Sequence, residues 1–195
     1  LGFSFNKNNW LLTLENFYKK VDGITSMSQG FQNQYEFVKT NGNFTVYGTE
    51  FLIQKQFRHI TSWVSYTFQE NNYEFKTLNA KAFPNNFEIK HHIKSAFISD
   101  FKNIKLAIGA QWFTGKPTTL PISTTPIYTN PETPAVGYQA PNSSNLEDYF
   151  QVNFSGAYAF NIGTKSKLNF GFSVQNLLNN KTSINQHYRI NNNTN

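Results

Sequence analysis

The amino-acid sequence predicts an all-β protein whose antiparallel strands follow one another in an up-and-down meander. Apolar and polar residues alternate with a period of two through most of the chain, which is the period of strands and not of helices. Tight and long connections alternate between the predicted strands. Aromatic residues make up 17% of the 195 residues and charged residues only 14%, whereas a soluble domain has about 25% charged residues.

The first three strands are predicted over residues 1–6, 9–22 and 43–57, where large apolar residues share one parity of the numbering. Asn16 interrupts this parity in the second strand. The apolar positions are Trp10, Leu12, Leu14 and Tyr18, then Tyr47, Phe51 and Ile53. Because successive side chains of a strand point to opposite faces, the pattern predicts a sheet with one apolar side.

Three further strands are predicted over residues 61–75, 88–101 and 104–114. Their alternation is less regular, because Trp63 and Ile98 lie on the polar parity. The apolar parity comprises Val64, Tyr66 and Phe68, then Ile89, Ile93 and Phe97, then Ile104, Leu106, Ile108 and Trp112.

The last two strands, predicted over 147–161 and 165–178, have the clearest alternation. Their opposite face is small or polar and carries no charge between Gln151 and Ala159, as expected for a crowded, wet barrel interior. We expect Phe154, Tyr158, Phe170 and Phe172 to face lipid, and Asn153, Ser155, Asn169 and Ser173 to face the interior.

The predicted connections are sorted by length. The tight ones span about residues 7–8, 58–60, 102–103 and 162–164, and the long ones span 23–42, 76–87 and 115–146. All tight turns therefore lie at one edge of the sheet. A soluble β-sandwich has no reason to sort its loops in this way, whereas outer-membrane barrels have short periplasmic turns and long extracellular loops. We therefore favour a transmembrane β-meander over a soluble β-protein.

We expect residues 1–195 to be one partial barrel domain of about eight strands. The chain starts within a strand, has no signal peptide and ends in the polar tail 191–195. The first strand would begin on the long-loop side, and one further strand is needed after 165–178 to return to the short-turn side. No stretch approaches the roughly 18 apolar residues of a membrane helix.

Five segments together resemble the C-terminal barrel of TonB-dependent outer-membrane receptors, particularly those of Bacteroidetes. They are residues 10–23, 46–53, 62–68, 112–118 and 149–181, the last containing an alternating strand that ends in Asn176-Leu177-Leu178-Asn179. The resemblance implies a 22-stranded barrel in the Gram-negative outer membrane, closed by an N-terminal plug. It also implies energised uptake of a siderophore, cobalamin or glycan-type ligand. Neither the plug nor the TonB-contacting box is present here, so contact with the TonB complex would belong to a region absent from this chain.

The side chains that often carry chemistry form no convincing constellation. Cysteine is absent, which excludes a thiol nucleophile and a zinc ribbon. His91 and His92 are adjacent and would point to opposite faces of a strand, so they cannot chelate one ion together. We therefore expect no catalytic site, metal or cofactor, and no enzyme activity.

The net charge of +6 does not indicate nucleic acid, because only Arg58 and Arg189 are arginine and the lysines are scattered. The expected partners are outer-membrane lipid and a small ligand. Six of the seven prolines lie in 115–146, and a restricted backbone loses less entropy on capturing a ligand. Tyr128, Tyr138 and Gln139 in this loop are the candidate ligand-binding residues, since they could stack on a sugar or siderophore and hydrogen-bond to it.

Two alternatives remain open. The chain could form a complete small barrel of eight to ten strands with an adhesin or structural role. It could also be an outer-membrane enzyme, which has less support because no nucleophile constellation is visible.

Overall fold

The structure, a computed structural model, describes residues 1–29, 37–76, 79, 81–130, 133–164 and 166–190. These residues form an all-β structure without a helix. The strands are β1 (Gly2–Lys7), β2 (Trp10–Gln29), β3 (Phe37–Phe57), β4 (Ile60–Glu74), β5 (Phe83–Pro84), β6 (His91–Phe101), β7 (Ile104–Phe113), β8 (Pro117–Thr118), β9 (Ile127–Asn130), β10 (Thr133–Ala135), β11 (Ser144–Asn145), β12 (Tyr149–Ile162) and β13 (Ser166–Val174).

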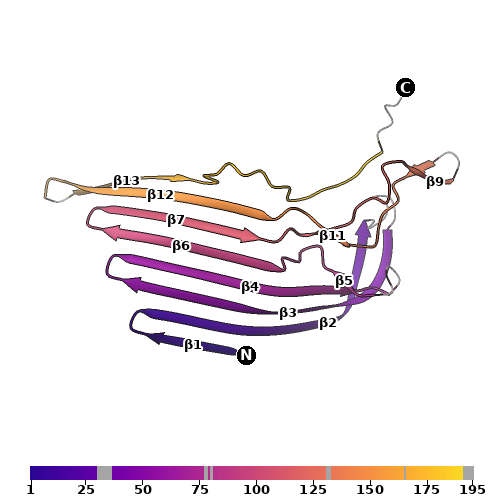
Figure 1. The fold of residues 1–195 in the computed structure, drawn as a ribbon, viewed down its shortest axis with the longest axis horizontal. Helices are drawn as coiled ribbons and strands as arrows, with labels where there is room; N and C mark the ends of the chain where they lie inside the picture. The colour runs from indigo at the N-terminus through magenta and orange to yellow at the C-terminus, as the bar shows by residue number, and fades with distance from the viewer. Residues whose placement is uncertain (30–36, 77–78, 80, 131–132, 165, 191–195) are drawn as a thin grey trace, which may run out of the picture.

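Most strands form one antiparallel sheet in the order β1-β2-β3-β4-β6-β7-β12-β13, with β5 paired to β4 (Figure 1). The up-and-down meander is thus confirmed. Two small pairs, β9 with β10 and β8 with β11, lie in the long connection between β7 and β12. Within the described residues β1 and β13 do not pair with each other, so the sheet is open.

The tight turns are built by residues that adopt a left-handed backbone. Asn8 and Asn9 both have positive φ (51° and 63°) between the paired residues Lys7 and Trp10, as the two-residue hairpin turn with the right twist requires. Arg58 and Lys102 have positive φ in the next two tight turns. The sequence therefore places Asn, Arg and Lys where the hairpins reverse.

The first long connection differs from the prediction of a loop over 23–42. A register shift follows Val21, with Gly23 at a φ of 73°, and pairing then resumes from Ile24↔Gly42 to Gln29↔Phe37. β2 and β3 therefore continue as a two-stranded ribbon beyond the sheet. A bulge changes which parity faces which side, so an alternation read from the sequence ends there although the pairing does not.

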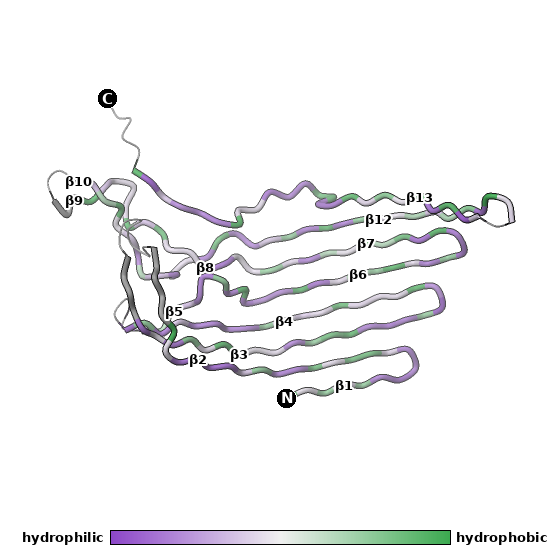
Figure 2. Tube along the Cα trace, turned by 180° about the vertical axis from the view of Figure 1, so that it is seen from behind, coloured by the Kyte–Doolittle hydropathy of each residue, from purple (hydrophilic) through white to green (hydrophobic). Residues whose placement is uncertain are grey.

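The two faces of the sheet differ in chemistry along its whole width. Paired residues share a face, and one row across the sheet consists of Phe3, Leu14, Phe51, Tyr66, Ile93, Trp112 and Phe150. The neighbouring row on the other side consists of Ser4, Thr13, Leu52, Ser65, Lys94, Gln111 and Gln151. We call these sides the apolar face and the polar face; the alternation is visible along the strands in Figure 2.

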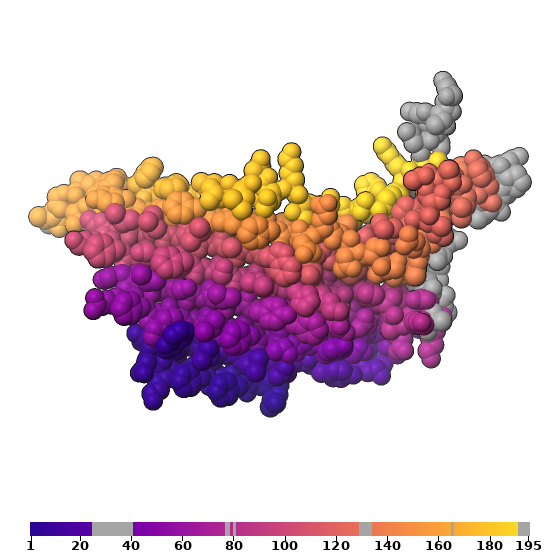
Figure 3. Space-filling view, in the orientation of Figure 1, coloured from indigo at the N-terminus to yellow at the C-terminus, as the bar shows by residue number. Residues whose placement is uncertain are grey.

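No second layer of described residues covers the apolar face. Every large hydrophobic side chain that is highly exposed within the eight strands of the main order lies on this face, for example Phe97 (45%), Ile108 (44%) and Phe170 (66%). Figure 3 shows one side of the sheet, coloured in chain order, with no second layer packed over the side in view. The buried aromatic side chains of the described residues are Phe75 and Phe83, which pack against Tyr73 near the end of β4.

The tight turns are staggered along the sheet. The row of paired residues that starts at Lys7, beside the first turn, runs through Trp10, Lys55, Ser62, Phe97, Ile108, Phe154 and Val174. The turns of β3–β4, β6–β7 and β12–β13 close two, four and eight residues beyond this row, as the left side of Figure 1 shows. If the turns lie in one plane, eight residues over six strand steps correspond to a strand tilt of roughly 40°, using about 3.3 Å per residue and about 4.8 Å between strands.

Candidate functional site

The long connections gather at the end of the sheet opposite the tight turns (Figure 1). They comprise the ribbon of β2 and β3, the segment between β4 and β6, and the segment between β7 and β12. Side chains from the last two segments contact each other directly. The segments between β4 and β6 and between β7 and β12 therefore form one joined surface at this end of the sheet.

Asn142 joins the two longest described connections. Its side chain is 5% exposed, and its Nδ2 donates to the carbonyl oxygen of Pro84 at 2.8 Å and to Oδ1 of Asn86. Its backbone N–H donates to Oγ1 of Thr119 at 2.9 Å. The positive φ of Asn142 (53°) suits asparagine, which tolerates the left-handed region. One amide thus ties β5 and the residues after it to the segment between β7 and β12.

Gly115 lies where the start of the β7–β12 connection packs against its end. Its N–H donates to Oδ1 of Asp148 at 3.1 Å, and its carbonyl oxygen accepts from Nδ2 of Asn145 at 2.8 Å. A Cβ on Gly115 would lie 1.8 Å from the carbonyl oxygen of Leu146. The backbone can therefore approach this closely only because residue 115 has no side chain.

The predicted ligand-binding residues are placed in two groups. Tyr138 forms an isolated bridge with Pro121, and its ring meets that of Tyr188 edge to face at 6.5 Å. Gln139 donates from its backbone N–H to the carbonyl oxygen of Leu120 and from Nε2 to that of Pro121. Tyr128 lies apart on β9 and is 66% exposed. Tyr138 and Gln139, which are neighbours in the chain, thus both pair with residues 120–121, whereas Tyr128 lies on a separate hairpin. Ligand binding by all three stays a prediction.

A row of amides on the polar face was not singled out from the sequence. Nε2 of Gln111 donates to Oε1 of Gln151 at 3.2 Å, and Nε2 of Gln151 donates to Oδ1 of Asn153 at 2.7 Å. At the end of this row nearest the long connections, the rings of Phe113 and Tyr149 stack with their centroids 4.6 Å apart and an angle of 9° between the ring planes. In the sequence, Gln111 and Gln151 each lie at a polar position of the alternation in their strand, which predicts that both face the polar side. Only the strand register shows that they lie opposite each other.

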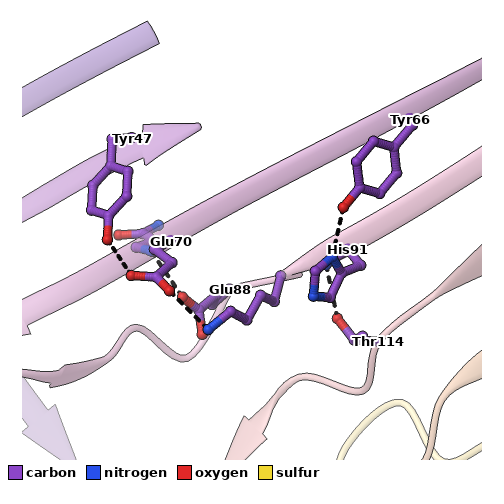
Figure 4. A network of polar contacts seen from close by, with 8 residues as sticks. Tyr47, Tyr66, Glu70, Glu88, His91 and Thr114 are labelled. Atoms are coloured by element: carbon purple, nitrogen blue, oxygen red, sulfur yellow. Dashed lines mark hydrogen bonds and ion pairs between the residues drawn. The ribbon is translucent and has the colours of Figure 1, made fainter. Parts of the chain in front are cut away.

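A polar network closes the apolar face at the long-connection end (Figure 4). Nζ of Lys90 lies 2.8 Å from Oε1 of Glu70, and the Tyr47 hydroxyl donates to the other oxygen of this carboxylate. Nearby, the Tyr66 hydroxyl and Nδ1 of His91 are 2.9 Å apart. On the apolar face of β4, the apolar side chain of Phe68 is thus followed, two residues later, by the charged Glu70.

Glu88 is the buried acid of this region. Its side chain is 7% exposed, and its Oε1 accepts from the N–H of Asn71 at 2.9 Å. Burial raises the pKa of the Glu88 carboxyl, and the bond from Asn71 opposes part of that rise. A carboxyl with a raised pKa in the folded state stabilises the fold in full below the pKa of the unfolded chain, about 4.3 for glutamate, and this stabilisation is lost as the pH rises through the folded-state value.

We therefore predict that Glu88→Gln removes the contribution of this carboxyl to the pH dependence of the free energy of unfolding. The glutamine should keep the hydrogen bond from the N–H of Asn71. As the pH falls from neutral, the free energy of unfolding of the wild type should rise relative to that of the variant. Urea unfolding of both proteins in detergent at several pH values measures this difference. Glu88→Ala is the control, since loss of the acceptor should destabilise at every pH. A constant difference between wild type and Glu88→Gln across the pH range would contradict the prediction.

The described residues contain no group of three or more His, Asp or Glu side chains that could hold a metal ion. His91 and His92 lie on opposite faces, as predicted: His91 contacts Tyr66 on the apolar face, and the ring of His92 meets that of Phe113 on the polar face. The described part of the chain also has no helix with the length and hydropathy needed to cross a membrane.

Comparisons with protein families, with curated proteins and with solved structures find no match to this chain.

Proposed function

We propose that this chain is part of a β-barrel of the Gram-negative outer membrane, in a TonB-dependent receptor that takes up a siderophore, cobalamin or glycan-type ligand. In this proposal the apolar face contacts lipid and the polar face lines the barrel interior. The long connections form the outer, ligand-facing surface, and the TonB complex acts through a region outside this chain.

The uncovered apolar face carries the proposal. Water-soluble sheets pack an apolar side against a second layer, and exposed apolar patches on soluble monomers seldom exceed a few hundred Å². Here the apolar side spans eight strands and remains exposed from Phe3 in β1 to Phe170 in β13. Lipid is the environment in which such a face needs no protein cover.

The stagger of the turns supports the same environment. Transmembrane barrel strands tilt by about 35–45° and carry an apolar band about 25 Å tall. If the tight turns lie in one plane parallel to the membrane, their stagger corresponds to a tilt of roughly 40°, at which a strand of ten residues rises by about 25 Å. β6 (11 residues) and β7 (10 residues) have the length that such a crossing needs.

The open sheet supports a barrel with more strands. Unpaired backbone groups cost several kcal/mol each in hydrocarbon, so spanning sheets close on themselves. β1 and β13 each have an outer edge that does not pair with the other within the described residues. The receptor assignment itself rests on the five segments that resemble the family and on the long connections gathered at one end.

Single cysteines test the orientation of the sheet, because the chain has no cysteine of its own. Phe154→Cys and Phe170→Cys should react with a lipid-soluble maleimide in vesicles and resist a charged one. Ser155→Cys and Asn169→Cys, their neighbours on the polar face, should show the reverse preference. Equal reactivity at both sets, or the reverse order, would rule out a lipid-facing apolar side.

Transport is tested in cells that carry the complete gene. Uptake of the ligand should stop when the proton gradient is dissipated, and also when residues 115–146 are deleted while the barrel remains in the outer membrane. The size of the barrel is tested on residues 1–195 in detergent. A monodisperse, heat-resistant monomer with a protease-protected core would favour the small complete barrel with an adhesin or structural role instead.

A further inference from the structure

The tight-turn edge repeats one arrangement at three successive hairpins. At each, an aromatic ring at the end of the apolar face has a cation placed over it. Nζ of Lys55 lies 4.7 Å from the ring centroid of Trp10, Cζ of Arg58 lies 5.5 Å from that of Phe57, and Nζ of Lys102 lies 5.2 Å from that of Phe101. These distances are those of cation–π contacts.

These cations lie on the outer side of the sheet. Lys55 pairs with Trp10 in the register and so shares the apolar face, while Phe57 and Phe101 are exposed on the same face (58% and 50%). Nζ of Lys55 also donates to the carbonyl oxygen of Asn8 in the first turn at 2.9 Å. The ring contacts hold the three charges on the apolar side, at the border between the apolar face and the turns. A charge directed toward the polar face would not contact these rings.

The protein supplies no counter-charge to these cations in its described part. The two ion pairs found there are Lys20 with Asp22 and Lys90 with Glu70, both toward the long connections. Within two residues of the three turns, the one acid is Asp100, which lies on the polar face opposite Lys105. The outer border of the tight turns is thus a row of positive charge without carboxylates.

We propose that this row binds the phosphate groups of anionic phospholipids in the leaflet next to the short turns. The inference rests on the proposed membrane location and adds a preferred lipid partner to it. Girdles of aromatic residues flank the apolar band of membrane barrels at both interfaces, and a lysine or arginine near an anionic bilayer surface is attracted to it. The phosphates would provide the negative charge that the protein omits, and the rings would keep the cations at the right height.

The test is binding of the full chain to vesicles of phosphatidylcholine alone or mixed with phosphatidylglycerol. The wild type should bind the anionic vesicles more tightly, with a preference that falls as salt is added. Lys55→Gln, Arg58→Gln and Lys102→Gln combined should reduce this preference by roughly tenfold or more. Lys76→Gln, Lys81→Gln and Lys116→Gln combined is the matched control, with the same change of charge in the long connections, and should keep most of the preference.

A charge-conserving variant separates loss of charge from loss of fold. Lys55→Arg, Arg58→Lys and Lys102→Arg combined should retain the preference, with β content by circular dichroism equal to that of the glutamine variant. Equal loss in the glutamine variant and the matched control, or no preference of the wild type for anionic vesicles, would overturn the lipid site and leave the membrane location standing. Failure to associate with either vesicle would remove both.

Discussion

Phe97→Arg is expected to destabilise the protein in lipid vesicles by about 2–4 kcal/mol, the cost of a cationic side chain near the midplane of a barrel's lipid face. Phe97 lies in the middle of β6 on the apolar face and is 45% exposed. Its register partners, Ser62 in β4 and Ile108 in β7, offer no charge to an arginine at this position. The measurement is the urea dependence of unfolding from vesicles.

Ala96→Arg is the matched control, one residue away on the polar face. A groove of about 330 Å³ lies over Ala96, lined also by Trp63, Gly109 and Asn153, so a longer side chain has room there. The control should cost much less than Phe97→Arg. Similar costs at the two neighbours would mean that the two faces meet the same surroundings, and the membrane proposal would fail.

Gly48→Ala should destabilise the sheet by about 1–3 kcal/mol, as expected when extra volume is forced into close-packed structure. Gly48 lies in β3, paired with Phe17 of β2 and Gln69 of β4. A Cβ here would lie 2.1 Å from the carbonyl oxygen of Phe68 and 2.7 Å from the ring of Phe17. The backbone must shift to accept it, because the oxygen belongs to a paired strand.

Gly109→Ala is the matched control, because Gly109, like Gly48, lies within a strand and on the polar face. The nearest atom to its added Cβ is the carbonyl oxygen of Ser95 at 3.6 Å, an ordinary contact. This variant should be neutral or slightly stabilised, because alanine loses less backbone entropy than glycine on folding. Midpoints of urea unfolding in detergent compare the two; equal shifts would show that the strands around Gly48 are not packed as the structure has them.

The sequence predicts the main sheet well because the side chains of its two faces differ so strongly in polarity. All eight predicted strands are present, and the parity of Phe154 and Phe170 gives their shared face. Differences occur where the periodic pattern ends. The strand predicted over 165–178 ends at Val174, because Asn176 and Asn179 adopt positive φ (both 52°).

The long connections could not be predicted in the same way. β5, β8 and β11 are two residues long each, too short for any alternation. The contact of Asn142 with Pro84 joins residues 58 positions apart and depends on one buried amide rather than on a pattern. Pairings of this kind follow from tertiary structure, so the sequence predicts where the long connections lie but not which side chains meet within them.

The order of the main sheet also bears on how the protein would fold. In the main sheet, neighbouring strands are also consecutive along the chain. Most contacts therefore form within hairpins, and each hairpin can form soon after its two strands are available. Long connections separate β4 from β6 and β7 from β12; the longest lies between Phe113 and Tyr149, the first paired residues of β7 and β12. Loop-closure entropy grows only slowly with length, by about 0.6 kcal/mol per doubling. Joining the β1–β7 half to the β12–β13 hairpin closes this longest loop and should be a late step, but because the cost of closure grows so slowly, shortening residues 115–146 should speed folding only modestly.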